Sequence, residues 1–265
     1  MKLNLELKAG IILALIIIFL SLLSFFWTPY DINLMDNQNR LQSPSFTHIF
    51  GTDNFGRDIF SRVITGGRNS LLLAFCTVTA SLIIGSILGL FSGYLGGIPG
   101  EIILRIIDSI SSFPAIVFAL LLVAVLGSSS FTLFLALLIV FIPSYTRIIR
   151  TGTMQYKNLS FIQAEKIIGA GFFRIIFIHI LPNLVPSLLS ASVLGLSNAI
   201  LAEAAMSYLG MGIQPPNPSW GRMLNEAQVF FINAPWCALT PGLFIMASVI
   251  SFHLLGEGLR KYARS

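Results

Sequence analysis

The chain has 265 residues, of which 55% are hydrophobic and only 10% are charged. Soluble globular domains carry about a quarter of their residues as charged side chains, so this composition excludes an ordinary water-soluble enzyme. The net charge of +5 at pH 7 requires no nucleic-acid partner, because Lys and Arg also gather where a membrane protein meets anionic lipid.

The few charges leave long gaps between them. Five blocks contain no Asp, Glu, Lys or Arg, at 11–27, 70–100, 109–146, 175–202 and 227–255. A spanning helix needs roughly 20 apolar residues, and the third block is long enough for two spans with a turn at Gly127 to Ser130. The sequence therefore predicts an all-α integral membrane protein with six transmembrane helices, at 9–27, 71–95, 103–126, 131–149, 184–206 and 237–256.

The first segment, 1–28, is interpreted as a retained transmembrane anchor. Its apolar run is longer than a signal-peptide core and no A-x-A cleavage pattern follows. With a cytoplasmic N-terminus, the inside segments hold most of the basic residues, from Lys2 and Lys8 to Arg260 and Lys261. The positive-inside rule then predicts that both termini are cytoplasmic.

Gly85, Gly89, Gly93 and Gly97 recur every fourth residue and line one face of the second span. Small residues in this pattern let helices approach closely. The pattern predicts tight packing within one subunit, and the alternative is a face against a partner subunit.

Carriers driven by ion gradients place ionisable residues near mid-membrane, and the predicted spans contain almost none. Asp108 has Arg105 one turn earlier as a predicted partner, and Glu203 stands near the outer end of span five. Both are interpreted as local pairs or boundary markers. No cluster of His, Cys, Asp or Glu has metal-ligand spacing, so no metal site is predicted. Cys76 and Cys237 are interpreted as packing residues.

Residues 150–182 form the one sizeable cytoplasmic segment. Asn158 or Ser160 is a predicted helix cap, and the following apolar side chains exceed what one short helix hides. Gly169 and Gly171 then allow a tight turn before a second amphipathic stretch, and Pro182 and Pro186 are expected to break or kink the entry to span five. The prediction is a helix–turn–helix that docks a partner. The alternative is an amphipathic helix lying on lipid.

This segment carries a recognisable motif. Gln163-Ala164-Glu165, three further residues and Gly169, followed by His179-Ile-Leu-Pro-Asn183, resemble the EAA loop of binding-protein-dependent ABC importer permeases. Gln163 stands where the family has Glu, and Glu165 stands where it has a second Ala. Three more stretches look like the C-type permease of the peptide/nickel importer group: the segment from Phe50 to Arg62, Arg105-Ile-Ile-Asp108 with Phe113-Pro114, and the segment from Glu203 to Gly212 with Pro216-Asn-Pro-Ser-Trp-Gly221.

The resemblance implies a type I ABC importer permease fold in a prokaryotic plasma membrane. Its partners would be a B-type permease, two ATPase subunits that bind ATP and Mg²⁺, and an extracytoplasmic substrate-binding protein. The chain itself has no G-x-x-x-x-G-K-[ST] motif, and no cofactor is expected in it. The coupling loop would comprise Gln163, Ala164, Glu165, Gly169, Ala170, Gly171, Leu181 and Pro182.

The resulting division of the chain is 1–28 for the anchor, 29–69 for an extracytoplasmic loop, 70–256 for the permease domain with its coupling loop at 150–182, and 257–265 for a basic cytoplasmic tail. In the outer loop, Asp53, Arg57 and Asp58 are expected to form local pairs with Arg62. The alternative is contact with the binding protein.

The second outer segment, 214–220, is stiffened by three prolines. It is interpreted as a lid or interface loop, and Trp220 suits the membrane–water boundary. Asp108, Glu203 and Trp220 are the candidate gate or interface residues.

The expected substrates are short peptides, or nickel or a metal chelate, and the short segment ahead of the first span favours the nickel branch. A proton-coupled secondary transporter is the alternative function. An intramembrane enzyme lacks the paired carboxylates or Ser/His arrangement that its chemistry needs.

Overall fold

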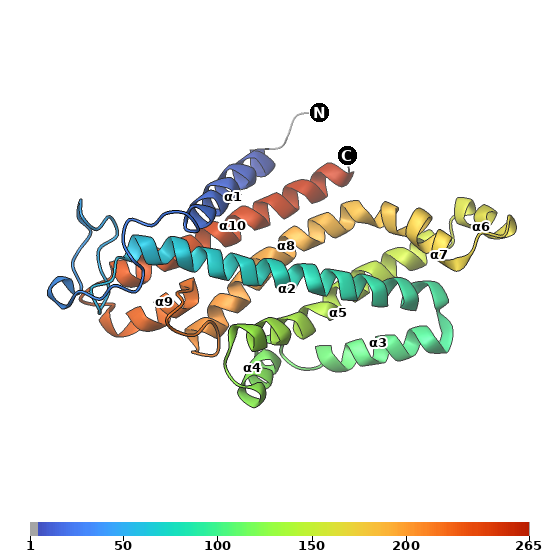
Figure 1. The fold of residues 1–265 in the computed structure, drawn as a ribbon. Coiled ribbons are helices and arrows are strands. Elements are labelled where there is room, and N and C mark those ends of the chain that lie inside the picture. Colours follow the sequence, from blue (N-terminus) through green and yellow to red (C-terminus); the bar gives the residue numbers. More distant parts are fainter. Residues whose placement is uncertain (1–4, 265) are drawn as a thin grey trace.

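The computed structural model describes residues 5–264 as an elongated bundle of helices (Figure 1). Within these residues, five helices are long and apolar enough to cross a membrane. They are α1 (Leu5–Leu23), α2 (Ile59–Leu95), α5 (Ser130–Tyr156), α8 (Leu181–Tyr208) and α10 (Trp236–Arg264). Shorter elements complete the described chain: η1 (Asn37–Asn39), α3 (Gly97–Ser111), α4 (Ala115–Leu126), α6 (Ser160–Ile167), α7 (Phe172–Arg174), η2 (Ile175–Ile180), α9 (Trp220–Ala227) and η3 (Gln228–Phe230). Lys2 lies outside the described residues.

The predicted third span is broken. Instead of one helix over 103–126, α3 and α4 meet at an angle of 84°. The break falls at Pro114, which precedes α4. Proline disfavours helical backbone at the residue before it and has no N–H for the helical ladder. The part of the chain that the structure describes therefore has five helices able to cross a membrane, or six where the bent pair counts as one span.

α2 begins much earlier than the predicted start at residue 71. Its first turns contain Arg62 and Arg68, whose charges moved the predicted boundary inward. The helix begins after Asp58, whose carboxylate accepts a hydrogen bond from the Ser61 N–H (2.8 Å). The outer loop therefore ends at residue 58 rather than 69. At the other end of the chain, the predicted tail 257–265 continues α10 as far as Arg264.

The entry to α8 is helical from Phe172 onward, although Pro182 and Pro186 were expected to break or kink it. A π-helical segment, η2, lies directly before α8 and ends two residues before Pro182. This wider turn accommodates the proline ring, and Pro182 falls in the first turn of α8, where its missing N–H costs little.

The glycines of α2 set its contact with α5. A Cβ on Gly85, Gly89 or Gly93 would come within 2.6–2.8 Å of the Cβ atoms of Tyr145, Ile149 and Thr153, respectively. Three glycines thus let the two backbones approach within one subunit. Gly97 does not belong to this stripe, because it starts α3 with φ +52° and a Cβ added there would meet no other part of the chain within 4 Å.

The start of α1 and the end of α10 lie at the same end of the bundle. α1 packs along α10 (Figure 1), and Lys261 Nζ is 2.6 Å from Glu6 Oε2. The two cysteines are free thiols, with Cys237 buried and Cys76 exposed. The packing role predicted for Cys76 is therefore wrong.

Candidate docking segment and loop-end charge cluster

The helical hairpin formed by α6 and α7, called the docking segment below (residues 158–174), projects from one end of the bundle. The loop 28–58 and α9 lie at the opposite end, called the loop end (Figure 1). The start of α6 differs from the prediction. Its N-cap position is Leu159, with no side-chain cap, and the Asn158 side chain instead donates to the Met154 carbonyl (3.2 Å).

The turn of the docking segment depends on one glycine. Gly169 has φ +83°, in the left-handed region that favours glycine. The Ala170 N–H donates to the Glu165 carbonyl (2.9 Å), which closes the end of α6. Gly171 has φ −68° and open space around it, so any residue could adopt its backbone conformation. The requirement for glycine therefore rests on Gly169 alone.

The docking segment is anchored on one side and apolar on the other. Ile162 is fully buried against Ile175, Ile176 and Ile180, and the Lys157 ammonium donates to the Gly93 carbonyl (2.9 Å). Phe172 also packs against this cluster, whereas four other large apolar side chains, Phe161, Ile167, Ile168 and Phe173, stay exposed. Ile167 and Ile168 retain 85% and 75% of their accessible surface, which is an unusual cost for a segment this short.

The polar residues of the motif do not all face outward. Glu165 Oε2 lies 3.5 Å from His179 Nε2, and both side chains are half-buried. The two atoms have no other partner among residues 5–264. Gln163 is exposed and its amide donates to the Lys157 carbonyl (3.1 Å). Glu165 therefore faces the end of η2 rather than a partner surface.

The other residues of the predicted loop divide in the same way. Ala164 is exposed at α6, and Pro182 is exposed in the first turn of α8. Ala170 and Leu181 pack against the apolar cluster around Ile162. The structure thus brings the motif together as one hairpin with a packed inner side and an exposed outer side.

The three candidate gate residues lie apart. Asp108 pairs with Arg147 (3.0 Å) rather than with the predicted Arg105. Glu203 is fully buried and accepts from the Ser207 hydroxyl (2.6 Å). Trp220 is also fully buried, and its indole N–H donates to the Val63 carbonyl (2.9 Å). Trp220 is therefore a core residue, and its ring has no surface left to face lipid as an interfacial tryptophan would.

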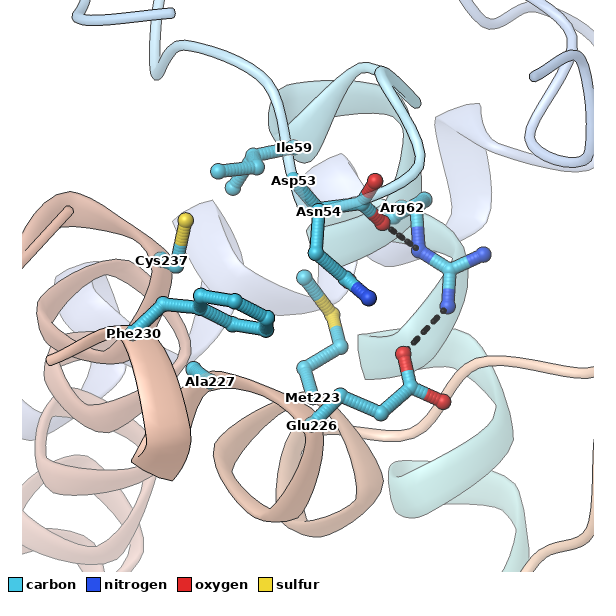
Figure 2. Close-up of a pocket in the computed structure, with 9 residues that line it drawn as sticks. All are labelled: Asp53, Asn54, Ile59, Arg62, Met223, Glu226, Ala227, Phe230 and Cys237. Atoms are coloured by element: carbon cyan, nitrogen blue, oxygen red, sulfur yellow. Dashed lines mark hydrogen bonds and ion pairs between the residues drawn. The ribbon is translucent and has the colours of Figure 1, made fainter. Parts of the chain in front are cut away.

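The loop end contains a charge cluster of Asp53, Arg57, Arg62, Arg222 and Glu226 (Figure 2 draws part of it). Glu226 of α9 is at its centre and lies 2.9 Å from Arg57 and 3.4 Å from Arg62. Asp53 lies 2.6 Å from Arg57 and 3.6 Å from Arg62. The two arginines keep only 7% and 2% of their accessible surface. The cluster joins the loop before α2 to α9.

Two details of this cluster differ from the sequence prediction. Asp58 does not pair with Arg62, since it caps α2 and lies 2.9 Å from His48 Nδ1. Glu226 was not predicted at all. More than 160 positions separate it from its partners, and no local sequence pattern indicates such a distant contact. Within residues 5–264, no group of three or more His, Cys, Asp or Glu side chains is placed to hold a metal ion.

A multi-crossing bundle with an apolar hairpin at one end is the architecture of a membrane transport subunit that docks a partner. Comparison of the sequence with known protein families identifies the family. Residues 85–264 match the family described as "Binding-protein-dependent transport system inner membrane component", and the chain belongs to it.

Three curated relatives are similar to this chain over most of its length. The dipeptide transport system permease protein of Alkalihalophilus pseudofirmus is 45% identical over 84% of this chain and 73% of its own. Its counterpart from Haemophilus influenzae is 39% identical over 95% of this chain and 87% of its own. The glutathione transport system permease protein of Escherichia coli is 41% identical over 93% of this chain and 83% of its own.

A solved structure shares the fold. The inward-facing methionine ABC transporter MetNI superposes with a TM-score of 0.62 at 18% identity, over 75% of this chain and 95% of that one. The predicted type I importer permease fold is confirmed. The chain is a multi-pass inner-membrane permease subunit of an ABC importer.

Proposed function

We propose that this chain is the C-type permease subunit of an importer for dipeptides and other short peptides. The observation that carries the proposal is the 45% identity with a dipeptide permease over 84% of the chain. The other relatives named above are permeases for dipeptides or glutathione, itself a short peptide. They give no support to nickel or a metal chelate, which the short N-terminal segment had favoured, or to a proton-coupled carrier.

The energy for transport would come from ATPase subunits docked on the docking segment, with ATP and Mg²⁺ bound to those partners. Two features support this role. The outer side of the hairpin exposes Phe161, Ile167, Ile168 and Phe173, and its inner side is fixed to α2 through Lys157. A surface that is apolar, exposed and rigidly mounted is suited to transmit force between proteins. The chain would complete the translocation path with a B-type permease.

The proposed orientation places the docking segment and both termini in the cytoplasm. The termini share one end of the bundle, away from the loop 28–58 (Figure 1). The docking segment and its flanks contain Arg147, Arg150, Lys157, Lys166 and Arg174, which suits the cytoplasmic side. The binding protein would then deliver substrate at the loop end.

The test is reconstitution of the full complex in vesicles with its binding protein. We expect vanadate-sensitive ATP hydrolysis that the binding protein stimulates, together with uptake of labelled di- or tripeptide. Free amino acids and Ni²⁺ serve as matched competitors. Competition by Ni²⁺ alone would contradict the peptide assignment, and uptake that an uncoupler abolishes at constant ATP would contradict the ABC mechanism.

A further inference from the structure

A groove opens on the bundle between α1, α2, α8 and α10. Its lining is almost entirely apolar, with one charged residue, Arg68, at its mouth. The remaining lining residues are Ile18, Ser21, Leu22, Phe25, Leu71, Leu72, Ala74, Phe75, Leu196, Ile200 and Phe252. The family match begins at residue 85, so α1 and the part of α2 that line this groove lie outside it.

The guanidinium of Arg68 is only weakly engaged by protein. It lies over the Phe25 ring, 4.5 Å from the ring centroid, and one N–H points to the Ser24 carbonyl at 3.5 Å. No carboxylate within residues 5–264 lies within 4.0 Å of it, in contrast to Arg57 and Arg62. A guanidinium has five N–H donors in a planar fork. Arg68 therefore presents an uncompensated positive charge and free donors at the mouth of the groove.

Arg68 stands at the level of a membrane surface. The rest of α2, residues 69–95, contains no Asp, Glu, Lys or Arg and is about 40 Å long at 1.5 Å per residue. That length covers the hydrocarbon core of about 30 Å. On α1, exposed Phe25, Phe26 and Trp27 follow the last helical turn, and exposed aromatic residues mark the membrane interface. Two independent helices thus place the mouth of the groove among lipid headgroups.

The groove continues from this mouth into the hydrocarbon. Arg68 and Phe75 are separated by two turns of α2, and Phe25 and Ile18 by a similar stretch of chain, which corresponds to about 10 Å of depth. Over that depth the wall is apolar apart from Ser21. A charged mouth above an apolar slot has the same polarity as a phospholipid, with phosphate at one end and an acyl chain below.

We propose that this groove binds an anionic phospholipid, whose phosphate is held by Arg68 and whose acyl chain lies against Leu22, Leu72 and Phe75. Arg pairs with phosphate through two parallel N–H···O bonds, and these charge-assisted bonds are stronger than neutral ones. The lipid completes the seam between α1 and α2. The inference concerns lipid alone and does not depend on which substrate the importer carries.

The test uses the detergent-purified importer complex and native mass spectrometry with added phosphatidylglycerol. We expect retained lipid that falls about tenfold in Arg68→Gln, the change that corresponds to 1.4 kcal/mol, and that Arg68→Lys partly restores. Arg40→Gln removes the same charge from the outer loop, where Arg40 donates to the Asn54 carbonyl, and serves as the control. Unchanged lipid retention in Arg68→Gln overturns the proposal.

A second pair of variants tests the part of the site that would hold the acyl chain. Phe75 lines the groove and is 58% exposed, whereas Phe19 on α1 is 65% exposed and lies outside the lining. Phe75→Ala should lower lipid retention and Phe19→Ala should not. Equal effects of the two variants would indicate general annular lipid and overturn the specific site. Displacement of the lipid by millimolar inorganic phosphate would indicate a site for an ion only and would contradict the lipid proposal. A photoreactive phosphatidylglycerol that labels neither α1 nor α2 would also contradict the lipid proposal.

Discussion

The two ends of the bundle differ in whether their costly side chains are covered within the chain. At the loop end, buried arginines are matched by Asp53 and Glu226 within the chain, and Trp220 is fully enclosed. At the other end, the docking segment leaves Ile167 and Ile168 largely exposed. The charge cluster at the loop end is thus neutralised within one chain, while the apolar outer side of the docking segment is left uncovered. Substitutions in the charge cluster should therefore affect stability, and those on the outer side of the docking segment should affect association.

The largest expected effect is at the loop end. Glu226→Ala leaves Arg57 and Arg62 buried with less compensation, and removing one partner of a buried ion pair costs about 3 kcal/mol or more. The free energy of unfolding, followed by denaturant titration in detergent, should fall by that order. The control is Glu257→Ala, because Glu257 pairs with half-exposed Arg260 and an exposed pair contributes roughly 1 kcal/mol or less. Equal losses in the two variants would show that the cluster is not a structural centre.

The next effect separates two neighbouring glycines. Gly169→Val forces a β-branched residue to φ +83°, at a strain of about 1–3 kcal/mol, and should lower coupled peptide uptake about tenfold while membrane insertion stays intact. Gly171→Val is the matched control, because its φ of −68° suits valine and no atom crowds the site. Uptake per ATP hydrolysed is the measurement. Normal uptake by Gly169→Val would contradict the role of this turn in coupling.

A third experiment compares exposed apolar residues at the two ends. Ile167→Ser removes apolar surface that docking would bury, and burial of such a side chain is worth about 1.5–3 kcal/mol. ATPase retention during purification should fall about tenfold or more, with the unfolding free energy unchanged. Phe46→Ser changes a fully exposed residue at the loop end and should leave ATPase retention intact. Similar loss in both variants would remove the distinction between the ends.

The smallest effect concerns the inner side of the docking segment. Glu165→Gln and His179→Gln each break the 3.5 Å contact between α6 and η2, and the double variant should cost less than the sum of the two. A coupling free energy of about 0.5–1 kcal/mol is expected for a half-buried pair. Binding-protein-stimulated ATP hydrolysis supplies the measurement. Strictly additive losses would place Glu165 against the partner instead of against His179.

Features that depend on local sequence could be predicted well. Charge-free blocks located the crossing helices, because the cost of burying charge in lipid acts on each segment separately. The Gly169 turn was equally visible, since a single residue determines its backbone. The bend at Pro114 was missed, because segment length alone does not distinguish one spanning helix from two at an angle.

Features that depend on distant contacts could not be predicted. Arg62 and Arg68 indicated a later start for α2. The buried Arg62 is tolerated in its first turns because Asp53 and, far along the chain, Glu226 both lie beside it. Trp220 follows a proline-rich loop typical of a membrane surface, yet the absence of a side chain at Gly67 leaves room for its ring in the core. Pairing across more than a hundred residues leaves no periodic pattern.

The length of α2 has a mechanical consequence. The helix is about 55 Å long at 1.5 Å per residue and is fixed at both ends, by the arginine cluster at its start and by Lys157 on the Gly93 carbonyl near its finish. Between these points its glycine face fits closely against α5. Such a rod does not shorten or buckle easily, because its backbone hydrogen bonds run along its axis. We therefore expect that force applied to the docking segment beside Lys157 tilts α2 as a whole and does not bend it.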